Sequence, residues 1–179
     1  MNQPLRVLFV CTANICRSPH LELTARHLAA GSPSVVFSSA GTHGFDAHPM
    51  DSEMAQTLPA GVDSASFRSR ALSPAILAEV DLVLTAEASH RSRILDDNPA
   101  LFRKVFTVGQ FAAAVPNHAG LHGSDLVRMA GMRRTPALPE QAQPAARAKG
   151  AERYEAFVEA LGRRLSKGPT LLREVSLDM

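Results

Sequence analysis

Hydrophobic residues are grouped along the first 108 positions into short apolar runs that alternate with helical patterns. The first run, residues 5–10, is almost unbroken, which is typical of a strand covered on both faces of a sheet. Three shorter runs predict further strands at residues 35–37, 82–84 and 105–108. Helices are predicted at four places. One runs from Ser18-Pro19 to Gly31, one covers residues 51–58, one starts at Ser73-Pro74 and one covers residues 87–95.

This alternation of strands and helices favours parallel pairing with right-handed crossovers. We therefore expect an α/β fold, a three-layer sandwich with a central four-stranded parallel sheet. In such sheets, ligands bind beyond the carboxyl ends of the strands. Residues 11–17 follow the first predicted strand and lie at that edge.

The periodicity fails between residues 115 and 150, where four prolines interrupt a segment rich in Ala, Gln and Arg. We expect a long loop here, of the kind that is often functional. An apolar repeat from Tyr154 to Leu165 then predicts a closing amphipathic helix, which ends at Gly168-Pro169. Residues 1–179 are expected to form a single domain.

Composition removes several classes of protein. The 19 Lys and Arg against 17 Asp and Glu leave a net charge of +2, which argues against a nucleic-acid or membrane-surface partner. No apolar run reaches membrane-spanning length, and the N-terminus does not resemble a secretory signal, so a cytoplasmic location is expected. Two cysteines are too few for a disulfide framework or a structural zinc site. No metal-like spacing is found among His43, His48, His90, His118 and His122.

The candidate chemistry lies in residues 11–19, where a cysteine ends a strand and an arginine precedes a helix start. Loop N–H groups and a helix N-terminus make an anion site. Arg17 offers a planar fork of donors that holds two phosphate oxygens at once. The same positive field favours the thiolate of Cys11, the form needed for nucleophilic attack. The predicted phosphate-binding loop comprises Thr12, Ala13, Asn14, Ile15, Cys16, Arg17 and Ser18.

The string Cys-Thr-Ala-Asn-Ile-Cys-Arg-Ser-Pro at residues 11–19 closely resembles the active-site loop of the low-molecular-weight protein tyrosine phosphatases, C-x-G-N-x-C-R-S-P. The resemblance continues through residues 38–42, 61–63 and 78–84, covers residues 5 to about 111, and returns at the closing helix. It implies a Cys-dependent phosphomonoester hydrolase that acts through a phosphocysteine intermediate, with no metal and no cofactor.

The resemblance also implies roles for individual residues. Cys11 would be the nucleophile and Arg17 would bind phosphate, while Ser18 would support the thiolate or the leaving oxygen. Asn14 and Ser39 would hold the loop in shape through side-chain hydrogen bonds.

Three positions depart from the family pattern. Ala13 replaces the loop glycine, which costs some strain if that position needs a positive φ. Phe67 replaces a family histidine. The family's general acid is an Asp-Pro pair before the last helix, where this chain has Gln143-Pro144. Glu140 is a possible general acid, no more favoured than a solvated loop charge, and Asp125 is a weaker candidate.

Two further residues bear on the site. Cys16 is close enough along the loop to form a reversible disulfide with Cys11, although a buried packing role is equally compatible with its position. The chain has no Trp and one Tyr, so the aromatic wall that suits a phosphotyrosine ring is incomplete. Phe45 offers part of such a wall, or packs within its loop.

The substrate stays open between protein phosphotyrosine and a small-molecule phosphate, such as a sugar or nucleoside phosphate. Arsenate reduction uses a related Cys-x5-Arg loop, but its thioredoxin-coupled form needs further cysteines after Cys16, and the chain has none. The alternative from another class is a catalytically impaired phosphate-binding module that recognises a phosphorylated partner. The missing Asp-Pro acid favours it, and the intact Cys11 opposes it.

Overall fold

The computed structural model describes residues 3–30, 32–118 and 120–133. Its centre is a four-stranded, wholly parallel sheet in the order β2-β1-β3-β4. The strands are β1 (Leu5–Cys11), β2 (Val35–Gly41), β3 (Leu82–Thr85) and β4 (Val105–Thr107). The four-stranded parallel α/β sheet expected from the sequence is therefore confirmed.

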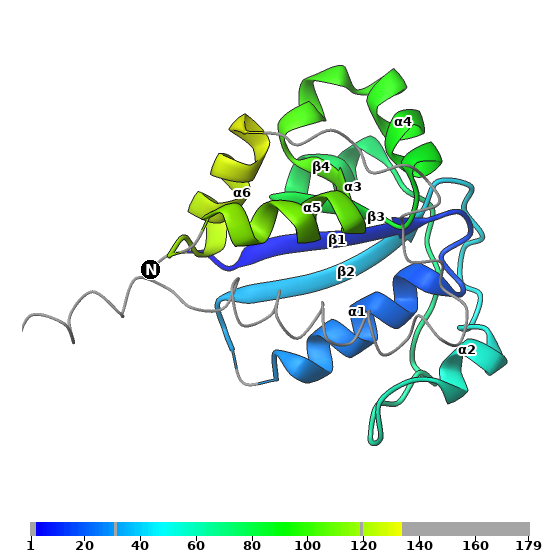
Figure 1. Ribbon diagram of the computed structural model, residues 1–179. Helices are drawn as coiled ribbons and strands as arrows, with labels where there is room; N and C mark the ends of the chain where they lie inside the picture. The colour runs from blue at the N-terminus through cyan, green and yellow to red at the C-terminus, as the bar shows by residue number, and fades with distance from the viewer. Residues whose placement is uncertain (1–2, 31, 119, 134–179) are drawn as a thin grey trace, which may run out of the picture.

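Helices cover both faces of this sheet (Figure 1). The α-helices are α1 (Arg17–Leu28), α2 (Ser52–Gln56), α3 (Pro74–Glu79), α4 (Ala88–Asp97), α5 (Val108–Ala114) and α6 (Gly123–Met132). The 3₁₀ helix η1 (Pro99–Arg103) joins α4 to β4. A second 3₁₀ helix, η2 (Val115–His118), follows α5.

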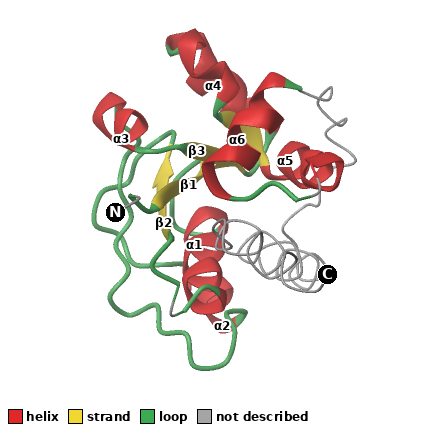
Figure 2. Ribbon diagram, turned by 90° about the vertical axis from the view of Figure 1, so that its left-hand side faces the viewer, coloured by secondary structure: helices red, strands yellow, loops and turns green. Residues whose placement is uncertain are grey.

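The sheet separates two hydrophobic cores, because successive side chains of a strand point to opposite faces. In β1, Val7 and Phe9 pack with residues of α1, α5 and α6, while Leu8 and Val10 pack with residues of α3 and α4. All four side chains are fully buried. Figure 2 shows α1 and α5 on one side of the sheet and α3 on the other, which gives the three layers.

The expectation of an unbroken loop from residue 115 is wrong for its first part, which contains η2 and α6. Helix α6 buries Leu126, Val127 and Ala130, spaced i, i+1 and i+4. The pattern was hard to recognise because glycine at both Gly123 and Gly131 lowers the helical propensity. A Cβ at Gly131 would lie 2.3 Å from the carbonyl oxygen of Arg103, so a larger residue would push α6 away from η1.

Helix α5 was also not expected, because the apolar run at residues 105–108 continues from strand into helix. Thr107 and Gln110 form a capping box that ends β4 and starts α5. The helix start expected at Ser73-Pro74 is confirmed, with the Ser73 hydroxyl accepting from the Ile76 N–H.

The predicted cap at Ser18, with Pro19 as the first helical residue, is wrong, because α1 begins two residues earlier, at Arg17, with Cys16 as its N-cap. Ser18 lies inside the first turn, and its hydroxyl contacts Cys11 Sγ instead of capping the helix.

Glu140, Gln143-Pro144 and the closing helix of residues 154–165 lie outside the described residues. Within the described ranges, no helix is long and apolar enough to cross a membrane.

Candidate active site

The loop between β1 and α1 leaves the carboxyl end of the sheet beside the end of β2. The N–H of Thr42 donates to the Cys11 carbonyl at 2.9 Å, and the N–H of His43 donates to the Thr12 carbonyl at 2.8 Å. A Cβ at Gly41 would lie 2.6 Å from the Thr12 oxygen. Only glycine therefore lets the loop lie this close to β2.

Cys11 is 97% buried, and its Sγ lies 3.0 Å from the hydroxyl oxygen of Ser18. Ser18 Oγ also accepts a hydrogen bond of 2.9 Å from the side-chain amide of Asn14. When Cys11 is a thiolate it has no proton to share, so the Ser18 hydroxyl must be the donor in this pair. The arrangement therefore suits a negative charge on the Cys11 sulfur.

Asn14 is the centre of the loop's internal hydrogen bonds and is fully buried. Its Nδ2 donates to Ser18 Oγ and, at 2.8 Å, to Ser39 Oγ, while its Oδ1 accepts from the N–H of Arg70 at 2.9 Å. Its φ of 59° places it in the left-handed region, which asparagine tolerates better than most residues. The structure brings Asn14, Ser18 and Ser39 together, and their role in holding the loop in shape stays a prediction.

The strain considered for Ala13 is absent. Among the non-glycine residues of the described chain, positive φ occurs at Asn14 and Ala47. The alanine in place of the family's glycine is thus accommodated, because the left-handed turn falls one residue later.

The peptide groups of the loop are available for an anion. None of the backbone N–H groups of residues 13–16 donates a hydrogen bond to another described residue. Unpaired N–H groups in succession, followed by a helix N-terminus, form an anion-binding concavity.

Arg17 begins α1 and forms an ion pair with Glu87, the residue that precedes α4. Glu87 is held beside the loop because the N–H of Ala86 donates to the Val10 carbonyl at 2.8 Å. Burial opposes ionisation of Glu87, but the hydrogen bond and charge of Arg17 outweigh it and lower the pKa of this carboxyl. Sequence reasoning missed Glu87, because only the β1–β3 pairing brings it to Arg17.

His90, in the first turn of α4, was given no role from the sequence, yet its Nε2 lies 2.9 Å from the hydroxyl of Thr12. His90 is 95% buried, and its Nδ1 has no hydrogen-bond partner among the described residues. Burial and the nearby charge of Arg17 lower the pKa of His90, so the neutral ring is favoured.

Cys16 is the last residue of the loop before α1, and Phe45 lies in the segment after β2. Both cysteines are free thiols, and Cys16 is partly buried. Burial, together with the Asp51 charge, raises the pKa of Cys16, against the effect of Arg17. Phe45 is 52% exposed, in the loop after β2, and its ring makes an edge contact with His48. A role for Phe45 in holding a substrate ring stays a prediction.

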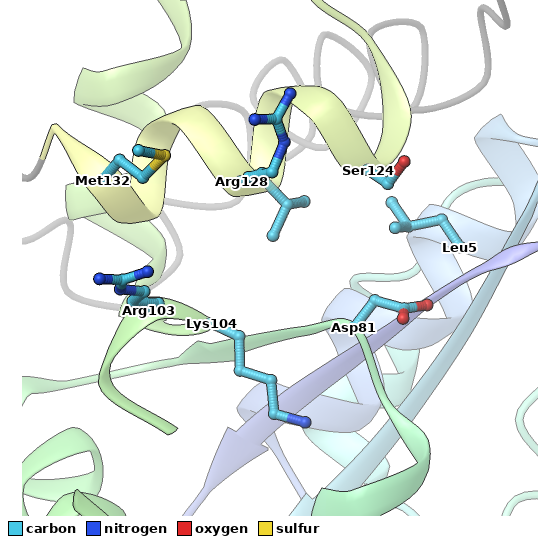
Figure 3. A pocket seen from close by; sticks show the side chains of 8 residues that line it. Leu5, Asp81, Arg103, Lys104, Ser124, Arg128 and Met132 are labelled. Carbon is cyan, nitrogen blue, oxygen red and sulfur yellow. The ribbon is translucent and has the colours of Figure 1, made fainter. Parts of the chain in front are cut away.

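A separate cavity of about 400 Å³ lies at the opposite, amino-terminal end of the sheet (Figure 3). The cavity is lined by Leu5, by Asp81 just before β3, and by residues of η1 and α6. None of the predicted site residues lines it. Among the described residues, no group of three or more His, Cys, Asp or Glu side chains could hold a metal ion.

A cysteine at a strand end, a loop whose N–H groups donate to no other described residue and an arginine at a helix start are typical of phosphatases of the Cys-x5-Arg type. A family model for the low molecular weight phosphotyrosine protein phosphatases matches residues 6–123. The chain belongs to this family, as its loop sequence predicted.

Individual proteins of similar sequence or structure are consistent with this assignment. The low molecular weight protein-tyrosine-phosphatase Etp of Escherichia coli is 34% identical over 106 residues, which cover 59% of this chain and 70% of that protein. Among solved structures, the low molecular weight protein tyrosine phosphatase from T. tengcongensis aligns with a TM-score of 0.66 at 28% identity, over 90% of this chain and 99% of that one. The arginine phosphatase YwlE of Geobacillus stearothermophilus has the same fold, with a TM-score of 0.64 at 23% identity over 98% and 99% of the two chains.

Proposed function

We propose that this phosphatase hydrolyses phosphomonoesters through a covalent phosphocysteine at Cys11. The thiolate attacks phosphorus, the S–P bond forms as the ester P–O bond breaks, and the leaving oxygen takes a proton from an acid or from water. Water then attacks phosphorus, which releases inorganic phosphate and regenerates the Cys11 thiolate. The step needs no metal, so chelators should leave activity intact. Activity lost on chelation and restored by a divalent cation would contradict this proposal.

One arrangement carries the proposal. The Cys11 sulfur is hydrogen-bonded to Ser18 at the base of a loop whose N–H groups at residues 13–16 donate to no other described residue. Arg17 flanks the same loop, and its guanidinium has donors beyond the one that serves Glu87. A phosphate can therefore be held by peptide N–H groups and Arg17 with its phosphorus facing the nucleophile.

The substrate class is protein phosphotyrosine or a small sugar or nucleoside phosphate. We would compare kcat/KM for phosphotyrosine peptides, a phosphoarginine peptide and a panel of phosphorylated metabolites. A preference of at least about tenfold for one class identifies it. Binding of these compounds without any turnover would instead support the phosphate-binding module.

The missing Asp-Pro acid predicts a steep leaving-group dependence. Protonation of a leaving oxygen is worth about 10² to 10⁴ in rate, mainly for basic leaving groups. Rates on aryl phosphates should therefore rise steeply as the phenol becomes more acidic. Gln143→Asp should raise the rate on phosphotyrosine and flatten the series, and Glu140→Gln should steepen it only if Glu140 is the acid.

Gln141→Asp is the matched control, since it makes the same change two residues earlier and no proline follows it. An equal gain in Gln141→Asp and Gln143→Asp would mean that added negative charge, and not the family's acid position, is responsible. No gain in Gln143→Asp would show that residues 143–144 do not occupy the family's acid position.

Mild peroxide should inactivate the enzyme reversibly. Peroxide oxidises Cys11 to a sulfenic acid, and the Cys16 thiol displaces water from it to form a disulfide that added thiol reduces. Because burial raises the pKa of Cys16, disulfide formation should be faster at alkaline pH. Cys16→Ser should recover less activity after thiol treatment, measured by assay and mass spectrometry, because oxidation of Cys11 continues. Equal recovery in both proteins would leave Cys16 with a packing role.

A further inference from the structure

Thr12, the residue after the nucleophile, shares a hydrogen bond with a buried histidine, and the proposed mechanism gives neither side chain a role. Thr12 Oγ1 lies 2.9 Å from His90 Nε2, and this hydroxyl makes no other hydrogen bond with a described residue. His90 is 95% buried in the first turn of α4, whereas Thr12 is exposed. The pair therefore joins a buried ring to a side chain that a substrate can reach.

The place of the proton on the His90 ring decides which atom of the pair donates. Burial and the charge of Arg17 lower the pKa of His90, so the neutral ring is favoured. His43 adds to this effect and Glu87 opposes it. A neutral imidazole carries its proton on one of its two nitrogens.

The surroundings of His90 Nδ1 select the other nitrogen as the carrier. Nδ1 is buried and has no hydrogen-bond partner among the described residues. A buried N–H without an acceptor is rarer in proteins than an acceptor without a donor. The proton is therefore on Nε2, where it faces the hydroxyl oxygen of Thr12.

This tautomer leaves the Thr12 hydroxyl with a proton to donate. The Thr12 oxygen is the acceptor from Nε2, and a hydroxyl has one proton of its own. That proton cannot point back at a nitrogen that already donates. His90 thus fixes the Thr12 oxygen, and the Thr12 proton is available to a bound substrate.

The leaving oxygen of a bound phosphomonoester lies on the side of the loop where Thr12 is exposed. In phosphoryl transfer the attacking atom, the phosphorus and the leaving oxygen are roughly in line. Cys11 is 97% buried at the base of the loop, so the leaving oxygen points outward from it. Thr12 directly follows Cys11 and is exposed, so we expect its hydroxyl on this outward side. The other three phosphate oxygens have the N–H groups of residues 13–16 and Arg17 as donors.

We propose that Thr12 is a catalytic residue whose hydroxyl donates a hydrogen bond to the leaving oxygen, and that His90 is the positioning residue that orients this hydroxyl. The inference rests on the proposed function, because it assigns both side chains to the same reaction. Thr12 keeps its proton throughout. As the P–O bond breaks, the hydrogen bond stabilises the negative charge that develops on the oxygen, and solvent water supplies the proton that the leaving group takes up.

The first test compares Thr12→Val with the wild type on aryl phosphates whose phenols differ widely in acidity. Valine is close to threonine in shape but has no hydroxyl. For the most basic phenol, kcat/KM should fall at least about tenfold, because the charge on its oxygen is largest. For the most acidic phenol, the fall should stay within about twofold. Thr12→Ser, which keeps the hydroxyl, should recover most of the loss.

Two results of this series would overturn the proposal. An equal loss in Thr12→Val for every phenol would place the hydroxyl on a phosphate oxygen that does not leave. No loss for any phenol would mean that the hydroxyl does not contact the reacting group. Thr57→Val is the matched control, because Thr57 is exposed at the end of α2 and donates to the Met54 carbonyl. It should leave the whole series within about twofold of the wild type.

The role of His90 is tested by two replacements. His90→Gln keeps a side-chain N–H that can donate to Thr12, so it should retain most of the rate on the basic phenols. His90→Leu has no donor and should reproduce the pattern of Thr12→Val. In the Thr12→Val background, His90→Leu should add little, since both changes remove the same hydrogen bond. Additive losses would overturn the positioning role.

The tautomer of His90 can be measured with neither a substrate nor a variant. In long-range ¹H–¹⁵N spectra of the ¹⁵N-labelled protein, a protonated ring nitrogen and a bare one have well-separated shifts. We expect His90 to show a protonated Nε2 and a bare Nδ1. A proton on Nδ1 alone would make Thr12 the donor to His90 and would overturn the proposal, even if the His90 variants do not fold.

Failure of the inference and failure of the proposed function give different results. If the proposed function is wrong, the wild-type protein hydrolyses none of the aryl phosphates. If only the inference is wrong, the wild type is active and its leaving-group dependence is unchanged in Thr12→Val.

Discussion

Cys11→Ser is expected to abolish turnover, with a fall in kcat of at least about 10³, because a hydroxyl is a far weaker nucleophile than a thiolate. Phosphate or vanadate should still bind, because the N–H groups of residues 13–16 and Arg17 are unchanged. Steady-state kinetics and the Tm increase caused by added phosphate measure the two effects separately.

The Tm increase also serves as the control for Cys11→Ser, since only a folded loop can give it. A Cys11→Ser protein that retains near-normal activity would refute the covalent mechanism. Loss of both activity and phosphate binding would mean that the Cys11–Ser18 contact is needed to form the loop itself.

Arg17→Lys should lower kcat/KM by roughly 10² to 10³ and also weaken phosphate binding. The guanidinium of Arg17 is planar, so it can donate to Glu87 from one nitrogen and to phosphate from the others. The ammonium of lysine is a compact point charge that cannot form this bidentate contact. Kinetics on one aryl phosphate and competition by inorganic phosphate measure both losses.

Arg93→Lys is the matched control, because Arg93 is exposed on α4 and makes no ion pair with another described residue. It should leave both constants within about twofold of the wild type, as surface changes usually do. Wild-type phosphate affinity in Arg17→Lys would show that the loop N–H groups hold phosphate without a bidentate arginine.

The local part of the fold could be predicted from the sequence. Residues 7–10 and 82–84 are apolar on both faces, and few structures other than buried parallel strands accommodate such runs. The loop string at residues 11–19 likewise carries its chemistry in consecutive positions, so its resemblance to the family was visible without coordinates. Helices α5 and α6 were missed because their helical signals are weak and begin inside other patterns.

Only the tertiary structure revealed several of the side-chain contacts around this loop. Glu22 meets Ser39 across 17 residues, Arg17 meets Glu87 across 70, and Thr12 meets His90 across 78. None of these pairs has a spacing that marks it in the sequence. Their partners are chosen by the parallel register of β1 with β2 and β3, which places three strand ends at one edge. A buried polar group must find its hydrogen-bond partner among whatever that packing brings near, because leaving it unpaired costs stability.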